Sequence, residues 1–253
     1  MPSLYLELLK KCLTRTLFPD ANYTMDMQVI PFDPEARRLG HLWPTEAMTM
    51  VGVERLNVLE KACVEALRNR VPGDFVECGV WRGGCSILMR AVLADAGDDT
   101  RRVWLFDSFE GLPKPDLVQD EGDRLHEYSY FAVPLEIVQS NFRSFDLLDG
   151  RVYFRKGWFR DTLPNPGMPY GDDLEQISVL RLDGDMYEST MLALENLYPR
   201  ISAGGYCLID DYGALKSCRQ AVRDYRRRQG ITAPVRWIDW TGIYWQVPES
   251  DGR

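Results

Sequence analysis

The sequence predicts an α/β fold built on a mainly parallel sheet. Short apolar segments alternate with amphipathic ones along most of the chain, and the apolar runs are nearly continuous, as in strands buried on both faces. Glycines follow the first of these strands and acidic residues follow later ones, which is where open α/β sheets hold ligands. These observations favour a ligand-binding or catalytic domain with its site at the carboxyl ends of the strands.

The N-terminal part predicts helices around an irregular segment. Leucines recur at helical spacing over residues 4–17, with Ser3 as a plausible N-cap. Residues 18–44 are rich in Pro, Asp and Met and show no period, so we expect a long flexible segment of the kind that often forms a lid. A second helix is expected over residues 44–70, ending before Pro72-Gly73.

The rest of the chain predicts the core. Residues 1–71 are expected to add helices and the lid segment to a core of residues 72–253, in one structural unit. The last two strands are separated by a short turn-like stretch, which predicts an antiparallel hairpin. Strands are expected at residues 75–79, 103–107, 152–155, 177–183, 205–210, 235–238 and 243–247, and helices at 85–95, 135–145, 187–200 and 214–229.

Composition excludes several classes of partner. A net charge of -8 and a pI near 5.0 argue against nucleic acid, whose phosphates need a basic surface. Charged residues interrupt the apolar N-terminus, so we expect neither a signal peptide nor a membrane span. The six cysteines form no Cys-x-x-Cys pair, and reduced core cysteines would fit a cytoplasmic protein.

The first strand leads into a glycine-rich loop, Glu77-Cys-Gly79-Val-Trp81-Arg82-Gly83-Gly84. Its Glu-x-Gly-x-x-x-Gly pattern differs from the Gly-x-Gly-x-x-Gly of pyrophosphate-binding loops, which disfavours an NAD oxidoreductase. S-adenosylmethionine (SAM) has no phosphate but carries an amino-acid head and a sulfonium. Glu77 could receive its ammonium group and the loop amides its carboxylate. A tight glycine turn without a ligand is the alternative.

An acid ends the next strand. Asp107 is placed where nucleotide-binding α/β folds hold ribose hydroxyls, with Ser108 and Phe109 beside it. A carboxylate accepts two hydroxyls at once, so Asp107 is a candidate ribose clamp; capping of the following turn is the alternative. Trp158, after the third strand, could stack on adenine or could belong to the core.

Four aspartates follow two further buried strands: Asp183, Asp185, Asp210 and Asp211. If the strands are neighbours, they lie only ~4.8 Å apart, and acids that close are costly unless a cation or a proton intervenes. Oxygen ligands without His or Cys select a hard ion such as Mg²⁺ or Ca²⁺. Capping of turns and of the following helix is the alternative.

A metal beside a SAM sulfonium suggests O-methyl transfer. Two vicinal hydroxyls of an acceptor could chelate Mg²⁺, which would lower the pKa of the hydroxyl to be methylated. Asp185 is the candidate general base, with Asp183, Asp210 and Asp211 as metal ligands. His126 is a rival base, although a loop histidine exposed to solvent is the simpler interpretation.

Five motifs in this order resemble the macrocin O-methyltransferase family, and the resemblance extends over essentially the whole chain. Members of that family methylate sugar hydroxyls on macrolides such as tylosin and mycinamicin, and on the noviose of novobiocin. The motifs are Pro72-Gly-Asp-Phe-Val-Glu-Cys-Gly-Val-Trp-Arg-Gly-Gly, Asp107-Ser-Phe-Glu-Gly-Leu-Pro, Gly157-Trp-Phe-Arg-Asp-Thr, Leu182-Asp-Gly-Asp-Met-Tyr and Ile209-Asp-Asp-Tyr.

The resemblance implies a class I SAM-methyltransferase (Rossmann-like) fold with a seven-stranded sheet, SAM, a catalytic Mg²⁺, an active-site lid and a homo-oligomer of dimers or tetramers. It carries the metal role onto Asp183, Asp210 and Asp211 and the base role onto Asp185. It further implies that Thr49 and Met50 touch SAM from the N-terminal helix, a contact that spacing alone does not suggest.

Three functions are therefore weighed. The first is methylation of a deoxysugar hydroxyl on a small-molecule glycosylated natural product. The second is methylation of a catechol or another aromatic vicinal diol, for which the chelation would be the same. The third is a non-catalytic SAM-binding or scaffold protein, which four aspartates at strand ends disfavour. The sequence departs from the family at residues 25–32 and 116–131, presumed acceptor-side regions, so the acceptor is not carried over.

Overall fold

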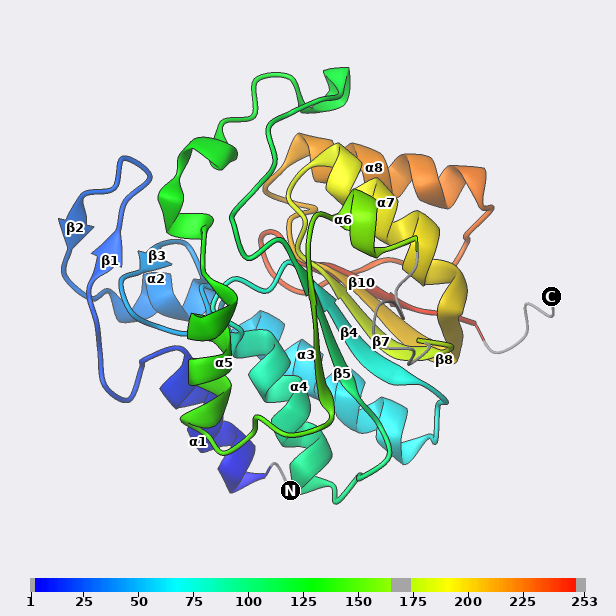
Figure 1. Cartoon of the computed structure of the whole chain (residues 1–253), viewed down its shortest axis with the longest axis horizontal. Coiled ribbons are helices and arrows are strands. Elements are labelled where there is room, and N and C mark those ends of the chain that lie inside the picture. The colour runs from blue at the N-terminus through cyan, green and yellow to red at the C-terminus, as the bar shows by residue number, and fades with distance from the viewer. Residues whose placement is uncertain (1–2, 165–173, 249–253) are drawn as a thin grey trace.

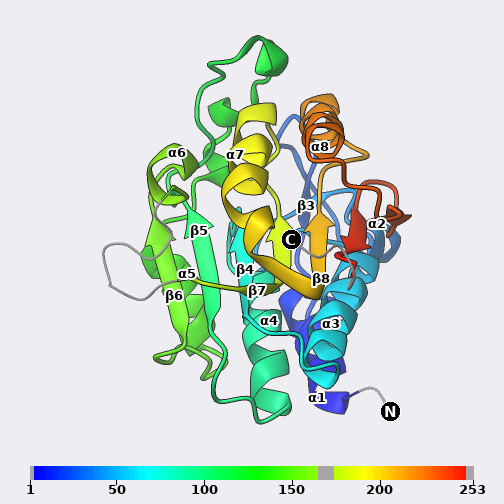
Figure 2. The same ribbon diagram turned by 90° about the vertical axis from the view of Figure 1, so that its right-hand side faces the viewer.

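A seven-stranded sheet lies between two layers of helices in the computed structural model, which describes residues 3–164 and 174–248 (Figures 1 and 2). The expected α/β architecture is confirmed. The strand order is β6-β5-β4-β7-β8-β10-β9. The strands are β4 (Asp74–Cys78), β5 (Val103–Asp107), β6 (Val152–Lys156), β7 (Ile177–Leu182), β8 (Ile201–Ile209), β9 (Arg236–Trp237) and β10 (Ile243–Gln246).

The order in which the strands are added to the sheet reverses between β4 and β7. Strands β4, β5 and β6 run outward to one edge, the chain then returns to place β7 beside β4, and these five strands, β4 to β8, run parallel to one another, whereas β10 pairs with β8 in the antiparallel sense. Ligands bind at such a switch point, outside the carboxyl ends of the strands. The expected antiparallel hairpin of β9 and β10 is confirmed, and β10 is the strand that pairs with β8.

Each face of the sheet has its own core. Because successive side chains of a strand point to opposite faces, Phe75 packs in one core and Val76 in the other. Helices α3 (Val53–Arg68), α4 (Gly84–Asp95) and α5 (Leu135–Arg143) cover the first face, with α1 (Leu4–Leu13) packed on α4. Helices α6 (Phe159–Thr162), α7 (Tyr187–Leu197) and α8 (Lys216–Arg228) cover the second.

The expectation of a structureless segment over residues 18–44 is wrong. This segment forms a small antiparallel sheet in the order β2-β1-β3 together with helix α2, seen in blue in Figure 1. The buried guanidinium of Arg37 explains its order, because it donates to the Thr14 carbonyl, to Asp20 and to the Asn22 side chain. The elements are β1 (Asn22–Tyr23), β2 (Val29–Ile30), α2 (Pro34–Leu39) and β3 (Trp43–Pro44).

The expected helix over residues 44–70 begins nine residues late, at Val53. Residues 45–52 instead run in a non-helical conformation, and Gly52 packs so closely on the Leu39 backbone that an added Cβ would lie 2.7 Å from the Leu39 carbonyl. The first helix also ends earlier than expected, at Leu13.

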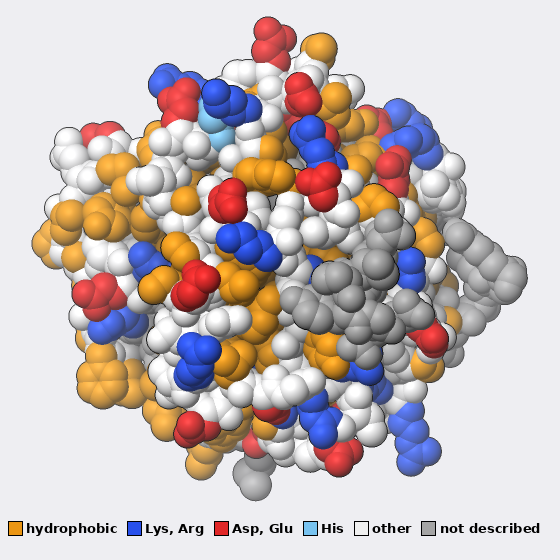
Figure 3. All heavy atoms as spheres, in the orientation of Figure 1, with side chains coloured by type: hydrophobic (Ala, Val, Ile, Leu, Met, Phe, Trp, Pro, Cys, Tyr) orange, Lys and Arg blue, Asp and Glu red, His pale blue; other side chains and the backbone are white. Residues whose placement is uncertain are grey.

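Apolar side chains are exposed over the N-terminal elements, at the left of Figure 3. The exposed apolar residues of the N-terminal part include Phe18, Met25 and Val29.

Other features of the fold are local. Three short 3-10 helices, η1 (Val118–Asp120), η2 (Leu125–Glu127) and η3 (Ser129–Phe131), lie between β5 and α5, and η4 (Tyr198–Arg200) follows α7. All six cysteines are free. Across residues 3–164 and 174–248, no helix combines the length and the apolar character needed to cross a membrane.

Gly79 allows the ends of the two central strands to touch. It follows β4 with φ +83°, and its N–H donates to the Phe106 carbonyl at 2.9 Å. An ideal Cβ built at Gly79 would lie 1.7 Å from the carbonyl oxygen of Asp183, whose own N–H donates to the Cys78 carbonyl. A side chain at this position would therefore push the two strand ends apart.

We expect Gly79→Ala to lower the free energy of unfolding by about 3 kcal/mol or more, because it combines a left-handed backbone with a clash against main chain. Gly97→Ala is the matched control, since Gly97 also has a positive φ but open space around its Cβ position. That control should lose only about 1 kcal/mol. Urea denaturation measures both, and equal losses would show that the contact with Asp183 is unimportant.

Candidate functional site

A cavity of about 380 Å³ opens at the carboxyl ends of the strands. This volume is within the range of small-molecule sites. Its wall is formed by the N-terminal segment, the loop after β4, the ends of β5, β7 and β8, and the loop between β5 and α5. Of the residues predicted from the sequence, those on the wall are Met50, Gly79, Trp81, Asp107, Ser108, Trp158, Asp183, Asp185, Asp210 and Asp211.

Asp107 ties two loops together beside the cavity. Its Oδ2 accepts the N–H of Val80 at 2.6 Å, and its Oδ1 accepts the N–H of Phe109 at 2.7 Å. Burial raises the pKa of the Asp107 carboxyl, against the opposing effect of these N–H groups. The turn-capping role is thus present, and the ribose role stays a prediction that the position on the wall allows.

Glu77 lies behind the wall. Its side chain is almost fully buried, and its two oxygens accept hydrogen bonds from Ser86 of α4 and, at 2.7 Å, from Arg181 of β7. Burial raises the pKa of Glu77 to about 7, although Arg181 opposes this change. Glu77 therefore holds β4, α4 and β7 together, and its predicted contact with the SAM ammonium group stays untested.

The N-terminal segment closes on the glycine loop. The N–H of Gly84 donates to the Met48 carbonyl at 2.9 Å, and Arg82 donates to the carbonyls of Thr45 and Ala47. These contacts place the side chain of Met50 on the cavity wall, from the loop before α3 and not from a helix. Four other predicted residues are not among the described residues of the cavity wall: Thr49, Arg82, Gly83 and Phe109.

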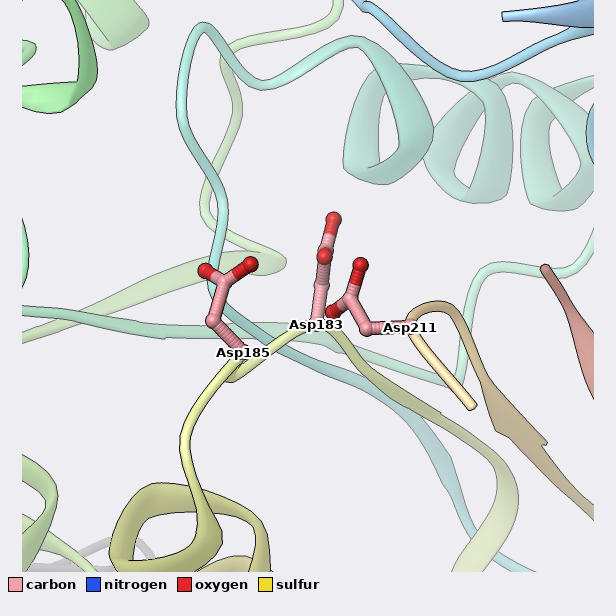
Figure 4. A group of neighbouring side chains, drawn as sticks. All are labelled: Asp183, Asp185 and Asp211. Carbon is pink, nitrogen blue, oxygen red and sulfur yellow. The ribbon is translucent and has the colours of Figure 1, made fainter. Parts of the chain in front are cut away.

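Three of the four aspartates converge. Asp183, Asp185 and Asp211 each place one carboxylate oxygen within 4.8 Å of the others. Figure 4 shows Asp183 and Asp211 side by side, with Asp185 on the neighbouring turn. Asp185 adopts φ +57°, a left-handed conformation that few residue types other than glycine, asparagine and aspartate adopt. This turn brings a second acid of the Asp-Gly-Asp motif to the same cavity.

Asp210 is held differently from the other three. Its Oδ1 accepts from Arg181 Nη2 at 2.5 Å and its Oδ2 from Arg55 of α3. The predicted trio of Asp183, Asp210 and Asp211 is therefore not the trio that converges. Successive residues at a strand end point to opposite sides, which explains why Asp210 and Asp211 have different partners.

The electrostatics separate Asp210 from the converging acids. Burial, followed by neighbouring carboxylates, raises the pKa values of Asp183, Asp185 and Asp211, those of the last two strongly. For Asp210 burial acts in the same sense, but Arg181 and Arg55 outweigh it and lower the pKa.

The converging acids suit a hard divalent cation. Asp211 Oδ2 is buried without a hydrogen-bond partner among the described residues, so one oxygen of the cluster has no proton donor. The cluster offers only carboxylate oxygens, the donors that Mg²⁺ prefers. A half-buried group of three acids of this kind is costly unless a cation or a proton balances it.

The sequence interpretation missed the buried arginines. Arg181 donates to Glu77, to Asp183 at 2.9 Å and to Asp210, while Arg55 bridges Asp210 and Asp239. A signal for Arg181 was available, because a charged residue inside the apolar run 177–182 must have a partner. Nothing local in the sequence indicates the partners of Arg55.

His126 stands apart from the aspartates. It lies in η2, and the described wall of the cavity includes its neighbour Leu125 but not His126. Its Nδ1 is buried without a partner among the described residues. In this arrangement Asp185 is on the wall and His126 is not, and both base assignments remain predictions.

The parallel sheet with an antiparallel last pair, the glycine loop after β4 and the acid at the end of β5 define a class I SAM-dependent methyltransferase. Residues 18–247 match the family described as Macrocin-O-methyltransferase (TylF), and the chain belongs to that family. The resemblance noted from the motifs is thereby confirmed, and the protein is a SAM-dependent O-methyltransferase.

Three known proteins illustrate the similarity. The chain is 50% identical to the 8-demethyl-8-(2,3-dimethoxy-alpha-L-rhamnosyl)-tetracenomycin-C 4'-O-methyltransferase of Streptomyces olivaceus, over 99% of this chain and 95% of the relative. It is 42% identical to the mycinamicin III 3''-O-methyltransferase of Micromonospora griseorubida, over 96% of each. The solved O-methyltransferase NovP superposes with a TM-score of 0.90 at 42% identity, over 97% of this chain and 98% of NovP.

We expect Arg181→Gln to lower the free energy of unfolding by about 3–5 kcal/mol, because it leaves buried carboxylates without their shared cation. Arg38→Gln is the matched control, since Arg38 pairs with Glu35 and their side chains are 44% and 64% exposed. The control should lose almost no stability, as expected for a solvated pair. Urea denaturation at neutral pH compares the two, and similar losses would mean that Arg181 is an ordinary ion-pair partner.

Proposed function

We propose that this enzyme transfers a methyl group from SAM to a hydroxyl of a deoxysugar on a glycosylated small molecule, and that it needs Mg²⁺. One observation carries the proposal: three carboxylates meet on the wall of a cavity that the glycine loop and Asp107 also border. The tetracenomycin relative, whose name specifies a rhamnosyl acceptor, supports a sugar over a catechol.

Asp183 and Asp211 would hold the metal, since they belong to both the predicted and the converging sets. Asp210 would be the third ligand; a carboxylate oxygen has two lone pairs, so Asp210 can keep its arginines and still coordinate. When bound, Mg²⁺ would hold the acceptor hydroxyl together with an oxygen on the neighbouring carbon, a hydroxyl or, in the dimethoxy-rhamnosyl acceptor, a methoxy oxygen, and lower the pKa of the hydroxyl to be methylated.

In this proposal Asp185 is the general base. It lies on the cavity wall next to the other acids but is bonded to neither Arg55 nor Arg181. The acceptor oxygen forms a bond to the methyl carbon while the carbon–sulfur bond breaks, and sulfur keeps the electron pair. The hydroxyl proton passes to the Asp185 carboxylate, and the products are the methyl ether and S-adenosylhomocysteine.

The rest of the wall would hold SAM. Asp107 would accept the ribose hydroxyls, Trp158 would stack on adenine, and Met50 would close the site from the N-terminal segment. Glu77, which lies next to the glycine loop, would receive the ammonium group of the amino-acid head. These assignments extend the predictions from the sequence and agree with the positions of Asp107, Trp158 and Met50 on the wall.

An acceptor panel tests the proposed reaction. We expect methyl transfer with Mg²⁺ to at least one of three glycosides, the rhamnosyl tetracenomycin, mycinamicin III and demethyldecarbamoylnovobiocin, which appear in the names of its relatives. Transfer should stop with EDTA and return with added Mg²⁺. Mass spectrometry detects the product. Methylation of a catechol in the same panel, with all three glycosides inert, would replace the sugar by an aromatic diol.

Single Asp→Asn variants separate ligands from the base. We expect Asp183→Asn, Asp210→Asn and Asp211→Asn to weaken Mg²⁺ binding at least about tenfold, because each removes a charged ligand. Asp185→Asn should bind Mg²⁺ as the parent does but lower kcat by about 10²–10⁴-fold. Calorimetry with Mg²⁺ alone measures the affinities. If Asp185→Asn loses Mg²⁺ and Asp210→Asn does not, the converging trio is the ligand set and the base is wrongly assigned.

A further inference from the structure

The helix that follows the Asp183–Asp185 turn is capped by a residue far away in the sequence. Helix α7 begins at Tyr187, and the residue at its N-cap position, Met186, has no side-chain acceptor. The first N–H groups of a helix need partners from outside it. Asp120 accepts the first two of these N–H groups. Its Oδ1 accepts from Tyr187 N at 2.6 Å, and its Oδ2 accepts from Glu188 N at 3.0 Å.

Asp120 is buried, and both of its carboxylate oxygens accept hydrogen bonds from α7. It is 2% exposed, and a carboxylate is rarely buried unless its oxygens are satisfied. The positive end of the α7 dipole adds to the two hydrogen bonds. Its neighbour Glu121 is exposed, so adjacent acids of one loop have opposite environments.

The cap lies at one end of the turn that contains Asp185. Only Met186 separates Asp185 from α7, and the left-handed φ of Asp185 leaves this turn dependent on what fixes its two ends. One end is fixed by β7, where Asp183 N donates to the Cys78 carbonyl. The other end runs into the start of α7, which Asp120 caps, and Ser217 of α8 also donates to the Asp185 carbonyl, at 3.4 Å.

The same contact fastens the loop between β5 and α5. Asp120 ends η1, and farther along this loop Leu125 and Phe131 form part of the cavity wall. The far end of the stretch is held at Tyr130, whose hydroxyl donates to the Pro44 carbonyl at 2.7 Å and whose carbonyl accepts from Trp81 Nε1 at 3.0 Å. Residues 117–131, here called the acceptor strap, are thus fixed at both ends.

We propose that Asp120 is a positioning residue for methyl transfer, which fixes the turn that carries Asp185 and docks the acceptor strap against the cavity in a single contact. The inference rests on the proposed function, because it assumes that Asp185 acts on the acceptor. The strap contributes apolar side chains, Leu125 and Phe131, to the wall. It therefore contacts the apolar part of the glycoside, while the acids contact its hydroxyls.

Trypsin digestion of the full-length protein tests the docking without an acceptor. Arg124 lies in the strap with its side chain 76% exposed, so cleavage after it reports how often the strap opens. We expect Asp120→Ala to raise the cleavage rate at least tenfold and Asp120→Asn, which keeps one acceptor oxygen, to raise it less. Glu121→Gln is the matched control and should be cleaved like the parent. A parent-like rate for Asp120→Ala would overturn the docking.

Kinetics with the panel glycoside that is methylated fastest test the positioning. In Asp120→Asn we expect kcat to fall at least tenfold and the KM of the glycoside to rise, while the affinity for S-adenosylhomocysteine stays within twofold of the parent. A merely structural role would change all three together or none, and either result would overturn the proposal. If no glycoside is methylated, the proposed function fails and the positioning role falls with it, whereas the digestion still decides the docking.

Discussion

The site depends on one buried cation, the guanidinium of Arg181. It sits at the end of the central strand β7 and is shared by Glu77 of β4, by Asp183 of its own strand end and by Asp210 after β8. An isolated carboxylate in this environment would lose its charge, because desolvation opposes ionisation. Arg181 thus lets acids from three neighbouring strands lie together, and it links the strand that precedes the glycine loop to the acidic side of the cavity.

Close contacts of the main chain and two further arginines also hold the segments of the site together. Gly79 brings the end of β4 against the carbonyl of Asp183, so the glycine loop and the acidic turn cannot move independently. Arg55 then reaches from α3 to Asp210 and Asp239, which joins the N-terminal part to the core. The N-terminal segment closes on the glycine loop through Arg82. Several residues of this N-terminal part, among them Met50 and Arg55, therefore belong to the cavity wall.

The strands, the hairpin and the strand-end acids could be predicted because they depend on local patterns: apolar runs, a short turn, and aspartates where such runs stop. The small sheet within residues 18–44 could not, since its order depends on Arg37 meeting Asp20 and Asn22 across the chain. The late start of α3 depends similarly on Gly52 packing against Leu39. The convergence of Asp185 rather than Asp210 with its neighbours depends on where two arginines lie, and their partners are set by the tertiary fold.

The distribution of arginines also indicates where positive charge is still needed. Arg55 and Arg181 each donate to one oxygen of Asp210, and their positive charges keep its pKa low. On the cavity side, Asp211 has an oxygen without a partner among the described residues. Burial and the neighbouring carboxylates strongly raise the pKa values of Asp185 and Asp211. The protein therefore balances the buried half of its acidic cluster with its own residues. On the cavity side, a proton or a cation would balance the charge of Asp185 and Asp211, because like charges this close together are costly when they are not compensated.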